Sequence, residues 1–313
     1  MKQSNPRHGR KHWIEPPFLK PGDRIAVTCP ASKMDRQVAE TAASIIEGWG
    51  FRVLLGDTVG AQYHNFSAPD EQRCSELQHM LDEDSIRAVI FGRGGYGMLR
   101  IIDKLDFSRL RRKPKWICGY SDITALHNHL GTCLGMESFH SVMCSGITSE
   151  TGGDPYVDSL RRSLTGERMA YSFSAHPLNR TGTASGTLVG GNLSLLVSLA
   201  GTISQPDTRG KILFLEDVGE YRYAVDRMMI QLQRAGWLQG ISALVVGGFT
   251  DYRETEEPFG QTEYEIIQDK VSELDFPVAF GFPAGHQREN YTLKMGGDYT
   301  VVVGETCMLK ENE

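Results

Sequence analysis

Residues 115–126, Lys-Trp-Ile-Cys-Gly-Tyr-Ser-Asp-Ile-Thr-Ala-Leu, combine a short apolar strand, a sharp turn and the start of a helix. After the turn, apolar residues recur at helical spacing at Ile123, Leu126 and Leu130. Ser121 occupies the turn, so its hydroxyl would project from the sheet edge beside backbone N–H groups, a geometry that suits a nucleophile. A plain helix N-cap is the more common reason for a serine at such a place, and this stretch alone favours the cap.

Upstream of this stretch, apolar strands are expected at 24–29, 51–55 and 86–91. Helices are expected between them, one of them opened by a capping box at 67–70, and a further helix is expected over 98–105. Strands that alternate with helices in this rhythm indicate a parallel sheet covered on both faces. The fold class is therefore α/β.

The composition of the chain changes between about 146 and 182, where polar residues, glycine and proline dominate. A domain boundary is expected there, with an N-terminal domain at 14–165 and a C-terminal domain at 180–308. The second half carries more glycine and more isolated strands, and it ends in a predicted hairpin over 291–303 that turns at 296–298.

Composition excludes several classes of protein. The 313 residues are 40% hydrophobic and 23% charged, as in ordinary globular proteins, and the net charge of −6 gives no electrostatic basis for binding nucleic acid or an anionic membrane. The first residues lack the apolar segment of a secretory signal, so a cytoplasmic location is expected. The six cysteines form no C-x-x-C pair and no metal-ligand spacing, so no metal is expected.

Residues 92–97, Gly-Arg-Gly-Gly-Tyr-Gly, match the pattern G-x-G-x-x-G after a strand and before a helix. A dinucleotide site is one interpretation. Against it, the motif follows the third predicted strand, and no strand ending in an acidic residue appears about twenty residues later. The N–H groups of such a loop can equally hold a carboxylate or an oxyanion, and a tight turn that needs positive φ is a third explanation.

Glu216 and His286 both stand at predicted strand ends, which converge on the ligand crevice of a doubly wound sheet. With Ser121 they supply the parts of a Ser-His-acid relay, which is defined by geometry and not by chain order. Each residue alone is a weak signal, because Glu216 with Asp217 could cap the following helix. Three other histidines are rival bases: His127, His129 and His140.

Together these segments resemble the LD-carboxypeptidase family. Six matching pieces occur in the family's order, and they span about residues 17–305. They are 21–26 (Pro-Gly-Asp-Arg-Ile-Ala), 93–97 (Arg-Gly-Gly-Tyr-Gly), 119–122 (Gly-Tyr-Ser-Asp), 190–192 (Gly-Gly-Asn), 215–217 (Leu-Glu-Asp) with 227–228 (Arg-Met), and 285–286 (Gly-His).

The resemblance implies an N-terminal flavodoxin-like domain with a parallel sheet and a C-terminal β-rich α/β domain. It implies Ser121 as nucleophile, His286 as general base and Glu216 as the residue that orients the base. The site would then lie between the domains of a homodimer, and neither metal nor cofactor would be required.

The chemistry of such a relay assigns further residues. The oxyanion donors would be the backbone N–H of Asp122 and that of Gly94 or Gly95. Among substrate-binding residues, Arg93 is the candidate for the terminal carboxylate. Asn192 is expected to hold substrate amides, and Tyr120, whose position varies in the family, is expected to touch substrate.

By resemblance, the substrate is the cell-wall tetrapeptide L-Ala–D-Glu–diaminopimelate–D-Ala, cut before the terminal D-Ala during murein recycling. A related branch of the family cleaves the amide that joins a peptide or aminoacyl group to a nucleotide, which confers self-immunity to an antibiotic. A third possibility from a different class is a non-catalytic nucleotide-binding module that uses the glycine loop.

Overall fold

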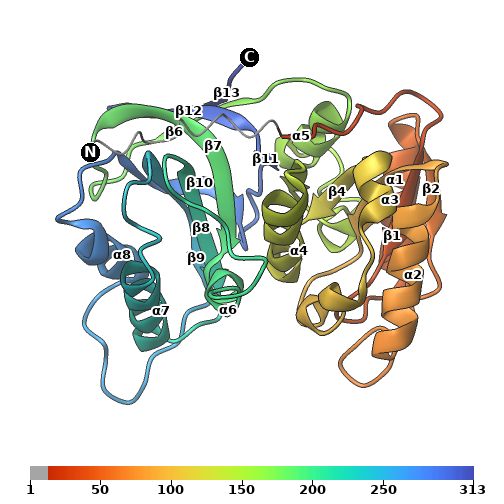
Figure 1. Ribbon diagram of the computed structural model, residues 1–313, viewed down its shortest axis with the longest axis horizontal. Coiled ribbons are helices and arrows are strands. Elements are labelled where there is room, and N and C mark those ends of the chain that lie inside the picture. Colours follow the sequence, from red (N-terminus) through yellow and green to blue (C-terminus); the bar gives the residue numbers. More distant parts are fainter. Residues whose placement is uncertain (1–12) are drawn as a thin grey trace, which may run out of the picture.

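The protein, seen in a computed structural model that describes residues 13–313, contains two β-sheets that lie beside each other (Figure 1). The first sheet has the order β2-β1-β3-β4-β5, all parallel, with β11 added antiparallel at the β5 edge. This strand order is the flavodoxin-like one, as expected. Its strands are β1 (Arg24–Thr28), β2 (Arg52–Leu55), β3 (Ile86–Phe91), β4 (Trp116–Gly119), β5 (Ser138–His140) and β11 (Leu293–Met295).

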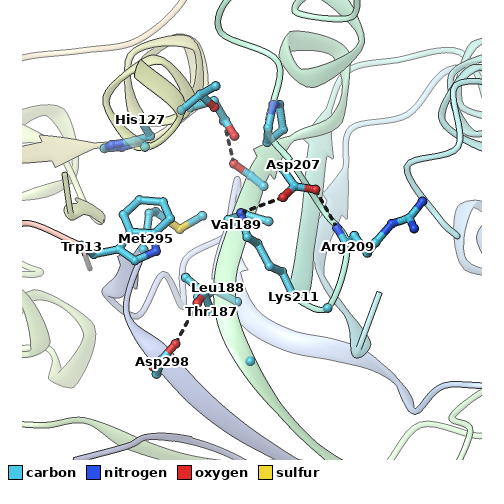
Figure 2. A pocket seen from close by; sticks show the side chains of 18 of the residues that line it. Trp13, His127, Thr187, Leu188, Val189, Asp207, Arg209, Lys211, Met295 and Asp298 are labelled. Atoms are coloured by element: carbon cyan, nitrogen blue, oxygen red, sulfur yellow. Dashed lines mark hydrogen bonds and ion pairs between the residues drawn. The ribbon is translucent and has the colours of Figure 1, made fainter. Parts of the chain in front are cut away.

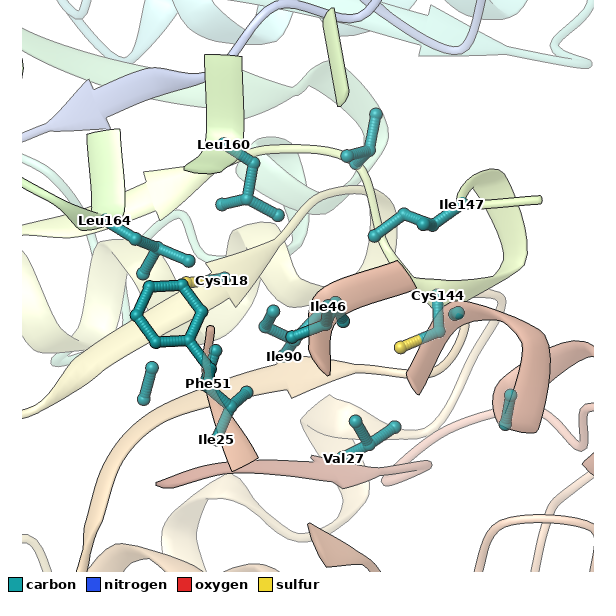
Figure 3. Packing of buried hydrophobic residues seen from close by; sticks show 14 of the residues in the cluster. Ile25, Val27, Ile46, Phe51, Ile90, Cys118, Cys144, Ile147, Leu160 and Leu164 are labelled. Atoms are coloured by element: carbon teal, nitrogen blue, oxygen red, sulfur yellow. The ribbon is translucent and has the colours of Figure 1, made fainter. Parts of the chain in front are cut away.

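Helices cover both faces of the first sheet, because successive strand residues point to opposite sides. Ile25 and Val27 of β1 pack on one side with residues of α1 and α5, whereas Ala26 packs on the other with α2, α3 and α4 (Figure 3 shows the first of these clusters). The helices are α1 (Arg36–Gly48), α2 (Asp70–Asp82), α3 (Ser108–Arg112), α4 (Thr124–His129) and α5 (Pro155–Leu164).

The second sheet has the order β10-β9-β8-β7-β12-β13-β6. The four strands from β10 to β7 are parallel and the last three pair antiparallel, with the long strand β7 shared between the two parts. Its strands are β6 (Ala170–Ser174), β7 (Gly182–Asn192), β8 (Ile212–Val218), β9 (Ala243–Thr250), β10 (Val278–Gly285), β12 (Asp298–Val303) and β13 (Thr306–Glu311). Three helices complete this half: α6 (Leu193–Ser198), α7 (Arg222–Arg234) and α8 (Glu263–Val271). The fold class expected from the sequence, an α/β chain with a flavodoxin-like first half and a β-rich second half, is confirmed.

The predicted hairpin over 291–303 is wrong. Strand β11 pairs with β5 in the first sheet, whereas β12 pairs with β7 and β13 in the second. The turn at 296–298 therefore passes the chain from one sheet to the other. A turn signal shows only that the chain reverses locally, whereas the partner of each flanking strand depends on tertiary packing. Strand β11 pairs in the first sheet, but its side chains Leu293 and Met295 pack into the core of the second.

Two local predictions also fail. Residues 98–105 form two short 3-10 turns, Met98–Arg100 and Ile102–Lys104, instead of one helix. The capping box at 67–70 is absent, because α2 begins after Pro69 and the Ser67 hydroxyl donates to the carbonyl of Cys29. Ser67 thus stabilises the loop after β1 and not the helix.

Lys294 of β11 joins the two sheets through a buried charge cluster. Its Nζ lies 2.8 Å from Glu15 Oε1 and 3.8 Å from Glu137 Oε2, and it also pairs with Glu311 of β13. Three carboxylates around one ammonium leave an excess of negative charge in a site where charge is costly. Burial raises the pKa of Glu137 to about 7, with Lys294 opposing the shift and Glu15, Glu311 and Asp298 adding to it.

This raised pKa predicts that Glu137 destabilises the fold as pH rises. The folded protein keeps a proton on Glu137 that the unfolded chain, with a carboxyl pKa near 4.5, releases at lower pH. The free energy of unfolding is therefore undiminished by Glu137 below pH 4.5, and it falls as pH rises through about 7. Glu137→Gln should therefore raise the free energy of unfolding by about 2 kcal/mol at pH 8 and by far less at pH 5. Urea unfolding at both pH values measures this, with the more exposed Glu15→Gln as control; a difference that does not change with pH would contradict it.

Candidate active site

Ser121 lies in a strained turn directly after β4. Its φ is +63°, one of three positive values among non-glycine residues in the described part of the chain. An L-residue in this left-handed region costs about 1–2 kcal/mol, so the surroundings must hold it there. The N-cap interpretation is wrong: the 3-10 turn Ser121–Ile123 begins after Tyr120 and α4 after Ile123, and neither start has a side-chain cap. A serine held on a strained strand-to-helix turn is instead the geometry of an exposed nucleophile.

The glycine loop 92–97 approaches Ser121 as closely as a backbone can. A Cβ placed on Gly94 would lie 2.7 Å from the Ser121 Cβ and 2.8 Å from its Oγ, so only glycine fits at this position. Gly95 has a φ of +103°, and the Gly94 carbonyl accepts the backbone N–H of Ser32 at 3.2 Å. The loop therefore both makes a tight turn and brings its backbone beside the hydroxyl of Ser121.

Glu216 and His286 form a hydrogen-bonded pair in the second sheet. Glu216 of β8 is fully buried, and its Oε2 lies 2.6 Å from the His286 Nδ1 and accepts the His286 backbone N–H at 3.2 Å. Since a carboxylate only accepts hydrogen bonds, Nδ1 carries the proton and Nε2 is left as the acceptor nitrogen. Gly285 permits the contact, because a Cβ there would lie 2.7 Å from the Glu216 side chain.

The charges around His286 favour its protonated form. Burial alone would lower its pKa, but the charge and hydrogen bond of Glu216, with Asp217 and Asp251 behind, raise it above the ordinary value. An imidazole whose imidazolium is stabilised in this way is a better proton acceptor.

Tyr120 connects the two halves of the site. Its ring centroid lies 4.8 Å from that of His286 and 5.8 Å from that of His140, and it directly precedes Ser121 in the chain. Burial and the charge of Glu216 raise the pKa of Tyr120 to about 12, so the phenol stays neutral at physiological pH. Tyr120, the neighbour of Ser121 in the chain, therefore contacts the histidine of the Glu216–His286 pair.

The side chain of Asn192, expected to hold substrate amides, makes hydrogen bonds within the protein. It is buried at the end of β7, where its Oδ1 accepts the Leu195 N–H as the N-cap of α6 and its Nδ2 donates to Asp217 at 2.8 Å. Its backbone N–H donates to the Thr124 hydroxyl of α4 at 3.1 Å. Gly191 allows this approach, since a Cβ there would lie 2.7 Å from the Thr124 Oγ1. These bonds fasten α4, the helix after Ser121, to the end of β7 in the second sheet (Figure 1).

The remaining candidates are also placed by the structure. Arg93 is exposed on the glycine loop. His127 is buried between the Ser138 hydroxyl and the Gly119 carbonyl, and burial lowers its pKa to about 4. His129 contacts the Ser204 hydroxyl, and His140 is fully buried. Within residues 13–313, His286 is the histidine that pairs with a carboxylate.

A cavity of about 750 Å³ lies elsewhere, between the middle of β7, the segment before β8, the end of α4 and the segment around Trp13 (Figure 2). Lys211 and Thr187 line it, and Thr187 donates to Asp298 at 2.7 Å. Glu216 stands at the other end of β8, so this cavity holds neither the serine turn nor the Glu216–His286 pair. The candidate site rests on the carboxyl ends of the strands, where the chemically active groups converge.

The side-chain contacts of two buried acids were not expected from the sequence, which named Asp122 only for its backbone N–H and Asp217 only as a possible helix cap. Asp217 accepts hydrogen bonds from the backbone of Val218 and Ser194 at the start of α6, and Asp122 accepts one from the backbone of Met98. Each directly follows a proposed triad residue, Glu216 or Ser121, and that adjacency was the signal for its side chain. Chain position does not show where a side chain points.

The Glu216–His286 contact predicts that Glu216→Gln lowers the pKa of His286, because the largest raising contributions come from this carboxylate. Titration of the His286 Cε1–H signal by NMR measures the change. Asp251→Asn is the matched control and should move the pKa less, since Asp251 contributes least among the named charges. An unchanged pKa in Glu216→Gln would contradict the pairing.

Comparison with known proteins identifies the family. The chain matches the model of the LD-carboxypeptidase N-terminal domain over residues 25–141 and that of the C-terminal domain over 185–301. It is 34% identical over 300 residues to a probable murein peptide carboxypeptidase of Bacillus subtilis, covering 95% of this chain and 94% of the relative. It is 30% identical to the murein tetrapeptide carboxypeptidase of Pseudomonas aeruginosa, covering 85% and 89%.

Among solved structures, the muramoyltetrapeptide carboxypeptidase of Oxalobacter formigenes superposes with a TM-score of 0.83 at 29% identity, covering 93% of this chain and 99% of that one. Both halves of the fold, and the sequence along almost its whole length, thus point to one family. The chain belongs to the LD-carboxypeptidase family and is a serine carboxypeptidase.

Proposed function

We propose that this protein removes the terminal D-Ala from the murein tetrapeptide L-Ala–D-Glu–diaminopimelate–D-Ala, using Ser121, His286 and Glu216 as a catalytic triad. The observation that carries the proposal is the strained Ser121 turn beside Gly94, next to Tyr120, whose ring contacts His286 of the Glu216–His286 pair. The names of the relatives in Bacillus and Pseudomonas support the choice of a murein peptide.

In the proposed reaction, His286 Nε2 takes the proton of the Ser121 hydroxyl as Oγ attacks the carbonyl carbon of diaminopimelate. Glu216 holds the Nδ1–H tautomer and stabilises the imidazolium. The tetrahedral intermediate collapses as His286 gives the proton to the leaving amine, so D-Ala departs and an ester on Ser121 remains. Water, activated by the same histidine, then releases the tripeptide and restores the serine.

The oxyanion of the intermediate is assigned to the backbone N–H of Asp122 and to that of Gly94 or Gly95. The close approach of Gly94 to the Ser121 side chain supports this choice, because donors must lie beside the attacked carbonyl. Such donors act with little reorganisation when the backbone that carries them is already held in place.

Substrate recognition is assigned to Arg93 and Tyr120. Arg93 is exposed on the glycine loop and can offer a charged fork to the terminal carboxylate, while Tyr120 presents a neutral ring beside His286. The side chain of Asn192 is already bonded to Asp217 and α6, so we assign it an indirect part, through α6 and the Thr124 contact.

The oligomeric state and the cellular location are proposed from the resemblance to the family. We infer a homodimer acting in cytoplasmic murein recycling. Sedimentation velocity tests the dimer. No helix within residues 13–313 is long and apolar enough to cross a bilayer.

A self-immunity peptidase that cleaves an aminoacyl-nucleotide amide is the second candidate, since the same relay would serve both amides. Parallel assays with the tetrapeptide and an aminoacyl sulfamoyl nucleoside separate the two by the ratio of kcat/KM. Membership of a peptidase family leaves no support for the non-catalytic nucleotide-binding module.

Ser121→Ala should abolish D-Ala release, with a fall in kcat of at least about 10³-fold, because both the nucleophile and its proton are lost. Free D-Ala is measured after incubation of wild type and variant with the tetrapeptide. Absence of release by the wild type would overturn the substrate, and equal release by both proteins would overturn the nucleophile.

Gly94→Ala should lower kcat about 10²-fold, because its methyl group would overlap the Ser121 side chain and displace an oxyanion donor. Gly146→Ala is the matched control, since a Cβ there would lie at an ordinary 4.0 Å from Val142. A Gly94→Ala protein that keeps the wild-type kcat would contradict the placement of the loop.

A further inference from the structure

Asp122 is buried beside the nucleophile with its side chain directed to the glycine loop. It is fully buried, and its Oδ2 accepts the backbone N–H of Met98, the residue after Gly97, at 2.7 Å. The same residue that follows Ser121 in the turn is therefore bonded to the C-terminal end of the loop.

A second group holds the same end of the loop. Arg73 of α2, fully buried, donates to the Gly97 carbonyl at 3.3 Å and to the Ala68 carbonyl at 2.9 Å. It also donates to the Pro30 carbonyl and pairs with Asp70. The Gly97–Met98 junction is thus held from both sides, by a carboxylate at the N–H of Met98 and by a guanidinium at the carbonyl of Gly97.

The carboxylate is costly in this position. Its Oδ1 accepts no hydrogen bond of good geometry within residues 13–313. Burial raises the pKa of Asp122 to about 6 against the opposing effects of the Met98 N–H, of Arg73 and of the Gly97 N–H. A buried carboxylate with an oxygen that accepts no good hydrogen bond destabilises the fold, which indicates that the position serves another purpose.

We propose that the Asp122 carboxylate is a positioning residue that fixes the glycine loop to the serine turn, so that the N–H groups of Asp122 and of Gly94 or Gly95 converge on one oxyanion. This deepens the proposed function and rests on it. One residue then supplies a donor through its backbone and sets the other donor through its side chain. The hydrogen bond from the Met98 N–H to Asp122 fixes the loop. A side chain of the same shape that keeps an acceptor oxygen there can therefore replace the carboxylate.

The test compares Asp122→Ala, which removes the acceptor, with Asp122→Asn, which keeps an amide oxygen at the same place. Asp122→Ala should lower kcat for D-Ala release at least about 30-fold while KM changes less than about threefold, since misplaced oxyanion donors weaken transition-state and not ground-state binding. Asp122→Asn should recover kcat to within about fivefold of wild type.

A control separates positioning from loss of stability. Asp106→Ala removes a comparable bond, from the Ser108 N–H to Asp106 at 2.8 Å, outside the site and should leave kcat unchanged. Thermal unfolding of each variant is recorded alongside, and Asp122→Ser replaces the alanine variant if that protein does not fold. Wild-type kcat in Asp122→Ala or Asp122→Ser, or equal loss in the alanine and asparagine variants, would overturn the proposal.

A second readout does not depend on the substrate. The rate at which a fluorophosphonate modifies Ser121, followed by intact-protein mass spectrometry, should fall in Asp122→Ala and recover in Asp122→Asn. If wild type releases no D-Ala, the proposed substrate fails, whereas this series of rates still decides the role of Asp122. Equal rates in wild type and Asp122→Ala would contradict it.

Discussion

A serine with a φ of +63° stays in that conformation only because its neighbours leave it no other. The strand β4 before it is buried, the helix α4 after it is fastened to β7 through Thr124, and the glycine loop closes against its side chain. The rest of the architecture can be understood as the support of this one backbone constraint. Its consequence is a half-buried serine side chain held against the backbone of the glycine loop, a geometry that suits acyl transfer.

The proposed general base comes from the other sheet. Glu216 and His286 follow different parallel strands, and their pairing depends on Gly285, whose missing side chain admits the carboxylate. Because the proposed nucleophile and the proposed base belong to different sheets, the contacts between the sheets would also set the catalytic geometry. The Asn192–Thr124 bond, the Lys294 cluster and the placement of β11 in the first sheet all contribute to that geometry.

The fold class was predictable from the sequence and is confirmed, whereas the roles of Ser121, Glu216 and His286, which relied on local patterns and on a family motif, stay predictions. Periodicity located β1 and α1, and strand ends located the acid and the histidine. The predictions that failed depended on tertiary choices. The segment 291–303 has the turn signals of a hairpin, but its two strands pair in different sheets. Asn192 caps α6 through its side chain, and its part in substrate binding stays a prediction. The left-handed turn at Ser121 could not be read from residues that fit an ordinary cap equally well.

The central claim is that Ser121 becomes covalently acylated through His286. Rapid quenching of the protein with the tetrapeptide, followed by proteolysis and mass spectrometry, tests it most directly. The account predicts an L-Ala–D-Glu–diaminopimelate ester on the peptide that contains Ser121 during the first turnover, and no such ester in His286→Ala. A tripeptide ester on a different side chain, or an equally fast ester on Ser121 in His286→Ala, would contradict it.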